Sequence, residues 1–90
     1  MNNWEENPDW KELSKPEIGD IVHLKLSDAF IYLIEAVVVA IEKDKITATV
    51  EALFDWDTKD WLTGGEKIAL VGKEISFKPK MVHKVIKKSA

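Results

Sequence analysis

The sequence predicts an all-β, mainly β fold, a small antiparallel barrel of five to six strands with a short N-terminal helical turn. Two observations favour it. Apolar residues alternate with other residues from position 46 to position 54, which is the period of a strand with one face on a core. Short apolar runs separated by turn residues follow one another along the chain. Ninety residues make one domain, so we expect an extension at 1–17 and a barrel domain at 18–90.

A hairpin over residues 33–54 is the central feature. Its first arm, 33–41, is apolar at nearly every position, which is typical of a strand covered on both faces or bent to serve two sheets. A helix is the competing interpretation of residues 32–43, but three consecutive valines are stiff at χ1 and disfavour it. A polar turn at 42–45 joins the two arms. The second arm has its apolar residues on alternate positions: Ile46, Ala48, Val50, Ala52 and Phe54.

Two elements precede this hairpin. Asn7, Pro8 and Asp9 predict a helix start, because Asn can cap, Pro fits the first helical position and Asp favours the positive end of the helix dipole. Pro16 ends this short helix, which we expect to plug an open end of the barrel. A first strand at 21–26 follows.

Shorter elements follow the hairpin. Residues 55–67 are the most polar stretch and are interpreted as an acidic loop. Residues 68–71 predict either a sixth strand or a loop packed on the core, and 74–78 predict a strand. Pro79 interrupts strand pairing before a last strand at 81–87. The predicted core is Val22, Leu24, Leu26, Val38, Ala40, Ile46, Ala48, Val50, Phe54, Ile75 and Phe77.

This pattern resembles a known class of small barrel. The entry at 19–22 (Gly-Asp-Ile-Val), the long hairpin and the run at 72–77 (Gly-Lys-Glu-Ile-Ser-Phe), followed by Val82, resemble an SH3-like barrel over roughly residues 18–87. The same run is similar to small uncharacterised bacterial proteins that open with Gly-Asp-x-Val and close with an apolar-x-Phe strand. The resemblance implies a fold and no activity. An OB-fold is the nearest alternative, but residues 58–65 are too short and polar for its helix.

Charge is unevenly distributed along a chain whose net charge is −3. Residues 1–20 are acidic, residues 73–90 are Lys-rich, and all thirteen basic residues are Lys. Arg is the preferred reader of phosphate and guanine, so its absence argues against specific nucleic-acid recognition. The Lys-rich end is interpreted as a solvated end or a complement to the acidic N-terminus. Weak, non-specific nucleic-acid association through this end remains the alternative function.

The sequence predicts neither a membrane-spanning segment nor a secretory signal peptide. No apolar run approaches the roughly 20 residues of a membrane span. The N-terminus is acidic and lacks the basic start and apolar centre of a signal peptide, so we expect a cytoplasmic protein.

Residues that could carry chemistry are few. There is no Cys, no nucleophile in a recognisable setting and no phosphate-binding glycine motif, so we expect no enzyme, cofactor or metal. Asp55, Asp57 and Glu66 match part of a calcium loop, but Asp60 stands where that loop requires Gly.

The two histidines, His23 and His83, lie on the first and last predicted strands, which often pair in a small barrel. Their rings could therefore approach each other. Zinc needs three or four ligands, and only carboxylates could complete such a site here. We expect two surface histidines.

The candidate binding site is built on tryptophan, of which the chain has four. Aromatic rings surrounded by carboxylates can hold a cationic or Pro-rich peptide. The competing interpretation is that Trp56 continues the alternation of the preceding strand and closes the barrel end. We expect a non-catalytic domain with a protein or peptide partner, as a monomer or weak homodimer. The candidate residues are Asp55, Trp56, Asp57, Asp60 and Trp61, with Trp10 and Tyr32 nearby.

Overall fold

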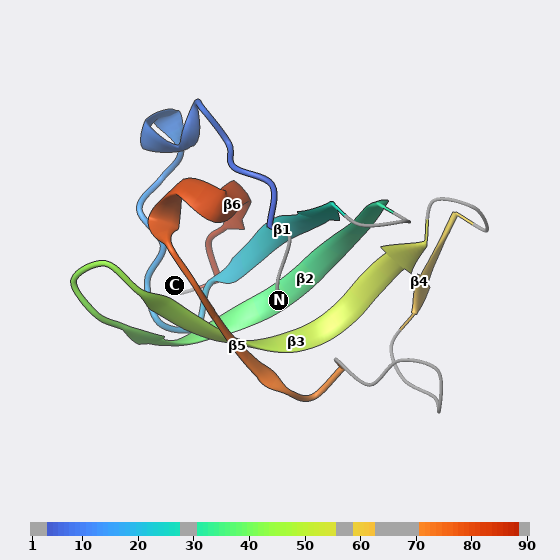
Figure 1. Ribbon diagram of the computed structural model, residues 1–90. Helices are drawn as coiled ribbons and strands as arrows, with labels where there is room; N and C mark the ends of the chain where they lie inside the picture. Colours follow the sequence, from blue (N-terminus) through green and yellow to red (C-terminus); the bar gives the residue numbers. More distant parts are fainter. Residues whose placement is uncertain (1–3, 28–30, 56–58, 63–70, 89–90) are drawn as a thin grey trace.

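The computed structural model describes residues 4–27, 31–55, 59–62 and 71–88, apart from the side chains at positions 26, 27, 31, 32, 55 and 62. The regular elements of this part of the chain are strands and two 3-10 turns (Figure 1), and every strand pairing in it is antiparallel. The predicted small antiparallel all-β barrel is confirmed. The elements are η1 (Trp10–Glu12), β1 (Ile21–Ser27), β2 (Ile31–Ile41), β3 (Ile46–Asp55), β4 (Asp60–Leu62), β5 (Glu74–Phe77), η2 (Pro79–Met81) and β6 (Val82–Ile86).

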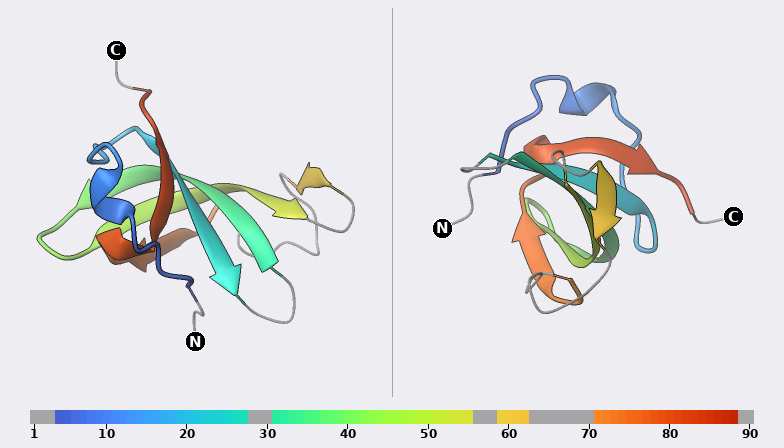
Figure 2. Two further views of the ribbon diagram at one scale, coloured as in Figure 1. Left: turned by 90° about the horizontal axis from the view of Figure 1, so that it is seen from above. Right: turned by 90° about the vertical axis from the view of Figure 1, so that its right-hand side faces the viewer.

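Strand β3 joins the two parts of the sheet. Strand β2 pairs along one edge of β3, while β5 pairs with the beginning of its other edge and β4 with the end of that edge. Strand β6 returns to pair with β1, which gives the order β4-β3-β2-β1-β6. Figure 2 shows the sheet curled on itself. The long β2–β3 ribbon therefore has its turn at one end of the molecule and β4 at the other.

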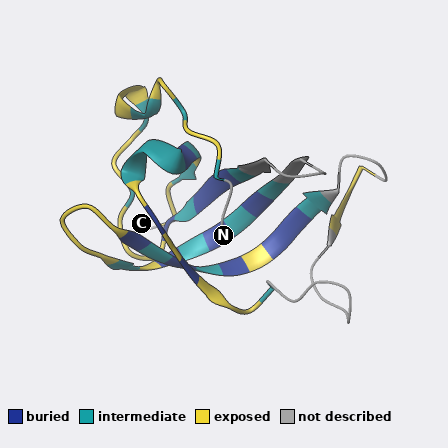
Figure 3. Ribbon diagram, in the orientation of Figure 1, coloured by how far each residue is buried: buried dark blue, intermediate teal, exposed yellow. Residues whose placement is uncertain are grey.

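The core lies between the β1–β3 meander and the strands β5 and β6. Figure 3 shows its buried segments in dark blue along β1, β2 and β3. The core prediction is confirmed at Val22, Leu24, Val38, Ile46, Ala48, Val50, Ile75 and Phe77. Side chains that were not predicted join them: Ile34, Ala36, Ala52, Leu53 and Val82. The side chain of Leu26 lies outside the described part.

Phe54 was predicted in the core, and this prediction is wrong. The register with β2 shifts by one residue between Val50 and Ala52, which makes Glu51 a β-bulge. One extra residue inverts the side-chain alternation of a strand. Leu53 therefore turns into the core, at 6 % exposed, while Phe54 lies half-buried on the outer face.

A second bulge lies near the other end of the ribbon. The register shifts between Val38 and Ala40, so Val39 is the extra residue of β2. Val39 is 40 % exposed. Ala40 is half-buried, so its prediction as a core residue is also wrong.

The acidic stretch 55–67 is not a loop throughout. Strand β3 runs to Asp55, and β4 pairs Trp61 with Phe54 and Leu62 with Leu53. Cross-strand apolar pairs stabilise a strand even among polar neighbours, which explains why composition alone predicted a loop.

Other predictions fall partly or wholly on residues outside the described part. Trp56 and Asp57 lie there, and so does most of the proposed strand at 68–71, of which Val71 is in a turn.

The helical turn begins later than predicted. It starts at Trp10 and has Asp9 at its N-cap position. Asn7, the predicted cap, instead accepts a hydrogen bond from the Asp9 N–H (3.1 Å) and donates its side-chain amide to the carbonyl oxygen of Val82 (3.1 Å). Docking on β6 therefore takes the place of capping. The predicted break at Pro79 is confirmed, since η2 begins there.

Candidate functional site

The predicted site residues lie at two ends of the molecule. Asp60 of β4 pairs with Asp55 of β3, and Asp55 pairs with Tyr32 of β2. These three residues therefore lie side by side on adjacent strands, next to Trp61. Trp10 belongs to η1 near the β2–β3 turn, at the opposite end of the ribbon (Figure 1). The structure therefore separates Trp10 from the other described candidates.

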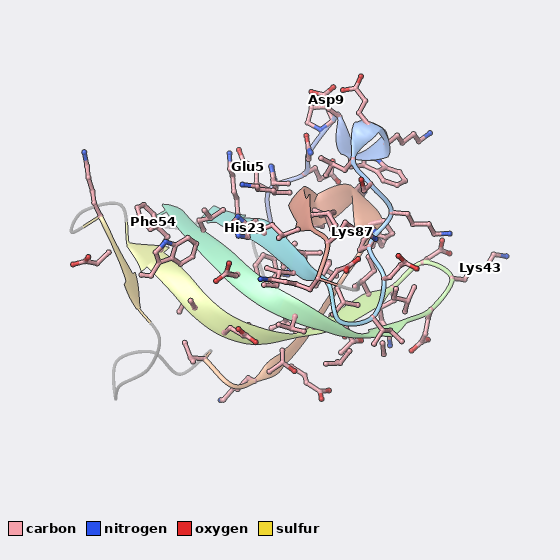
Figure 4. The ribbon with its side chains drawn as sticks, turned by 180° about the vertical axis from the view of Figure 1, so that it is seen from behind. Glu5, Asp9, His23, Lys43, Phe54 and Lys87 are labelled. Carbon is pink, nitrogen blue, oxygen red and sulfur yellow. The ribbon has the colours of Figure 1, made fainter. Side chains whose placement is uncertain are left out.

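Trp61 is the centre of an aromatic patch on the outer face. Its ring meets Phe54 edge-on at 5.2 Å between centroids and lies 5.8 Å from the ring of His23. Figure 4 shows His23 and Phe54 on this side of the molecule. Trp61 is still 42 % exposed, so a partner could contact it. Glu35 accepts a hydrogen bond from His23 Nε2 at 3.3 Å.

The expectation of two surface histidines is wrong for His23, which is 8 % exposed. The Trp61 ring and Glu35 cover it, and sequence alternation could not show that a residue of β4 reaches across to β1. His83 is more exposed and donates from Nε2 to the carbonyl oxygen of Glu5 at 2.9 Å. The two rings thus have separate partners. Within the described ranges, no group of three or more His, Asp or Glu side chains could hold a metal ion.

A groove of about 620 Å³ lies at the other end, beside the β2–β3 turn. One wall is the N-terminal segment at 10–16, and the other is the turn at 41–44. The floor includes Ile46 and Val82, two core residues, so the groove reaches down to the core. The predicted plug of the barrel end is therefore a wall that leaves an opening beside it. The apolar lining is Trp10, Leu13, Pro16, Ile41, Ile46, Pro79, Val82 and Val85.

Charged residues border this apolar groove. Lys11, Lys15 and Lys43 stand against Glu42 and Asp44 among the lining residues. The ammonium of Lys11 lies 5.7 Å from the centre of the Trp10 ring. Lys45, from outside the groove, forms an ion pair with Glu42 at 3.5 Å. The groove lining therefore has one more lysine than carboxylates, on a chain whose net charge is −3.

The N-terminal wall is attached to the barrel before η1. Asn7 donates its backbone N–H to the carbonyl oxygen of Lys80 at 2.8 Å, and its side chain bonds Val82 as described above. Glu6 forms an ion pair with Lys80 at 2.7 Å. The N-terminal segment also contacts β1, where the N–H of Glu5 donates to the carbonyl oxygen of Lys25 at 2.9 Å.

The same wall is attached again after η1, by Lys87. The Lys87 ammonium donates to the carbonyl oxygen of Lys15 and to Glu17 Oε1, both at 2.9 Å, and lies 2.6 Å from Asp20 Oδ2. Asp20 is fully buried at the foot of β1. It also accepts the backbone N–H groups of Glu17 (2.9 Å) and Lys88 (3.1 Å).

These contacts fix the ionisation of both partners. The hydrogen bond from Lys87 holds the pKa of Asp20 well below its usual range, and the two backbone N–H groups act in the same direction against the effect of burial. The hydrogen bonds to Asp20 and then to Glu17 raise the pKa of Lys87. The pair is therefore charged at neutral pH and holds the wall in place.

A glycine makes this arrangement possible. The N–H of Asp20 donates back to the carbonyl oxygen of Glu17 at 3.0 Å, which closes a tight turn with Gly19 at its third position. Gly19 has a φ of 95°, in the left-handed region that favours Gly. The Gly-Asp pair thus turns the chain into β1 and aims a carboxylate at Lys87.

Sequence reasoning missed the groove and the buried Asp20. The available signal was the opposite charge of the two chain ends, which was interpreted only as a possible complement. Glu6 with Lys80, and Glu17 and Asp20 with Lys87, show that the ends do pair.

No protein family, curated protein or solved structure matches the chain. The resemblance to SH3-like barrels therefore stays a prediction. Within the described residues, none of the helical segments is long and apolar enough to cross a membrane.

Proposed function

We propose that this protein is a non-catalytic peptide-binding module whose binding site is the groove between the 10–16 segment and the β2–β3 turn. The observation that carries the proposal is the groove itself, about 620 Å³ and lined mostly by apolar side chains. Ligand sites in proteins are typically concave, apolar and about 300–1,000 Å³ in volume. Ile41, 39 % exposed, offers apolar surface along one wall.

The two attachments of the wall support this proposal. A site that is ordered before its ligand arrives spends less free energy on ordering during binding. Asn7 attaches the wall on one side of η1 and Lys87 on the other. The Trp10–Pro16 segment is therefore ordered in the unbound protein.

The charge pairing supports a peptide partner over nucleic acid, which remains the alternative. Two of the lysines at the C-terminal end, Lys80 and Lys87, already face carboxylates of the N-terminal segment. A paired lysine releases few counterions from a phosphate backbone, so it contributes little to non-specific binding.

A displayed library of random peptides, selected on the immobilised protein, tests the groove. The enriched peptides are then measured on two variants that each place a carboxylate on β2, Ile41→Asp in the groove wall and Val39→Asp outside the groove lining. The two side chains are equally exposed, at 39 % and 40 %, so Val39→Asp is a matched control. Circular dichroism first establishes that both variants fold.

We expect the peptides to bind the parent and Val39→Asp alike and to lose about tenfold or more in affinity on Ile41→Asp, the size of an interface hot spot. Peptides that bind all three proteins equally, or a selection that enriches none, would contradict the groove as the binding site.

A further inference from the structure

We infer that the partner segment of the groove carries an acidic residue beside an apolar anchor. This inference rests on the proposed function and adds the chemistry of the partner. Three features of the groove lead to it: an apolar floor, a basic border and unpaired backbone donors on one wall.

The floor requires an apolar anchor. Ile46 and Val82 are 3 % and 2 % exposed, and Leu13, Pro79 and Val85 surround them in the groove lining. A polar side chain placed there would lose its hydrogen bonds to water, because these side chains offer no replacement. An apolar side chain at the same depth gains the free energy of leaving water.

The border favours a carboxylate next to that anchor. Lys11, Lys15 and Lys43 line the groove together with Glu42 and Asp44, and Glu42 is paired with Lys45 from outside the lining. The lysines of the border outnumber its carboxylates by one, whereas the chain as a whole carries a net charge of −3. A negative group on the ligand is attracted here, and a positive one is repelled.

The wall at Ser14 and Lys15 favours a peptide over a free fatty acid. Leu13 has an extended backbone, and Pro16 keeps the chain extended. The N–H groups of Ser14 and Lys15 donate to no other residue of the described ranges. Both residues line the groove, and an extended peptide has carbonyl oxygens to offer such unpaired donors, whereas an alkyl chain has none.

The test uses the enriched peptides and synthetic versions of the best binder. We expect acidic residues to be enriched beside Leu, Ile, Phe or Trp relative to the unselected library. Replacing the acidic residue of the synthetic peptide, Glu by Gln, should weaken binding to the parent about threefold at low salt, the scale of an exposed ion pair. The difference should shrink as salt is raised.

Two double variants locate the effect. Lys11→Gln with Lys43→Gln removes two of the three lysines of the groove border and should reduce the preference for Glu over Gln. Lys73→Gln with Lys84→Gln removes the same charge from exposed positions outside the groove lining and should keep the preference.

Each failure has a distinct meaning. Peptides that lose affinity on Ile41→Asp but show no acidic preference overturn this inference and leave the proposed function standing. A preference for Glu over Gln that is undiminished by the Lys11 and Lys43 changes also overturns it. If decanoate occupies the groove while no peptide depends on Ile41, the ligand is a free amphipathic acid and both proposals are wrong.

Discussion

At the scale of single residues, a substitution at Trp61 tests whether this side chain contributes to the stability of the fold or to partner binding. Its ring contacts Phe54 and lies near His23, yet it is 42 % exposed and outside the core. Trp61→Ala should therefore leave the fold intact and cost about 1 kcal/mol of unfolding free energy, the scale of one aromatic pair. Urea denaturation followed by circular dichroism measures this cost.

The same variant also decides between the two candidate surfaces. If the groove is the site, Trp61→Ala should leave the affinity of the selected peptides unchanged. A loss on Trp61→Ala, with none on Ile41→Asp, would move the site to the acidic surface around Asp60 and Trp61. An unfolded variant would instead place Trp61 among the residues that hold the barrel together.

Val50 tests the core. Its side chain is 1 % exposed in the middle of β3, so Val50→Ala should lower the free energy of unfolding by about 1–3 kcal/mol. Val39→Ala makes the same chemical change at a side chain that is 40 % exposed, and it should cost about 0.5 kcal/mol or less. Chemical denaturation of both variants makes the comparison, and equal costs would contradict the core assignment.

At the scale of elements, five of the described strands were predictable, whereas β4 and the bulges were not. Alternation identified β1, β3 and β5, because each has one face on the core. A bulge such as Glu51 leaves no mark in the sequence, since it depends on how β3 aligns with β2. The misplacement of Phe54 follows from that shift, and β4 was missed because its support comes from Leu53 and Phe54 across the sheet.

The candidate site shows the same division. Trp61 was singled out as a loop aromatic outside the strand alternation, but it lies in β4 opposite Phe54, where it is 42 % exposed. The groove could not be predicted, because its walls come from 10–16 and 41–44 and its floor includes residues of β3 and β6. Only the folded chain brings such distant segments together.

The turn into β1 should make stability depend on pH through Asp20. Its folded-state pKa is depressed, so its contribution is present above the unfolded pKa of about 4 and is lost as the pH falls through the folded value. The parent should be more stable than Asp20→Asn at neutral pH, and this difference should shrink below about pH 4. Urea denaturation of both proteins from about pH 7 to about pH 2 measures it.

Asp44→Asn is the control, because Asp44 lies in the exposed turn 42–45. Its stability should follow that of the parent across the pH range. If the difference in free energy of unfolding between the parent and Asp20→Asn stays constant with pH, the carboxylate acts through its shape and hydrogen bonds and not through its charge.

At the scale of the whole molecule, charge predicts weak association with nucleic acid. The net charge is −3, and Lys80 and Lys87 are paired with carboxylates of the N-terminal segment. Binding to single- or double-stranded DNA should be weaker than about 1 μM and should vanish by about 0.15 M salt. A salt titration by fluorescence anisotropy measures it, and sub-micromolar binding to a duplex at that salt would favour the alternative function.

The attachment of the groove wall has a consequence for the order in which the molecule opens. Asn7 bonds Val82 across 75 positions of sequence, and Lys87 bonds Lys15 across 72, whereas the β2–β3 ribbon is closed by a turn of four residues. Contacts that close long loops cost the most chain entropy, and those at exposed ends have few neighbours to hold them. The wall should therefore detach in small fluctuations while the ribbon stays paired.

In hydrogen exchange, the amide of Asn7 should exchange well before those of Val38 and Val50, and equal protection would show that the barrel opens as one unit. A groove that opens by releasing its wall would admit a bulky side chain without unfolding of the sheet.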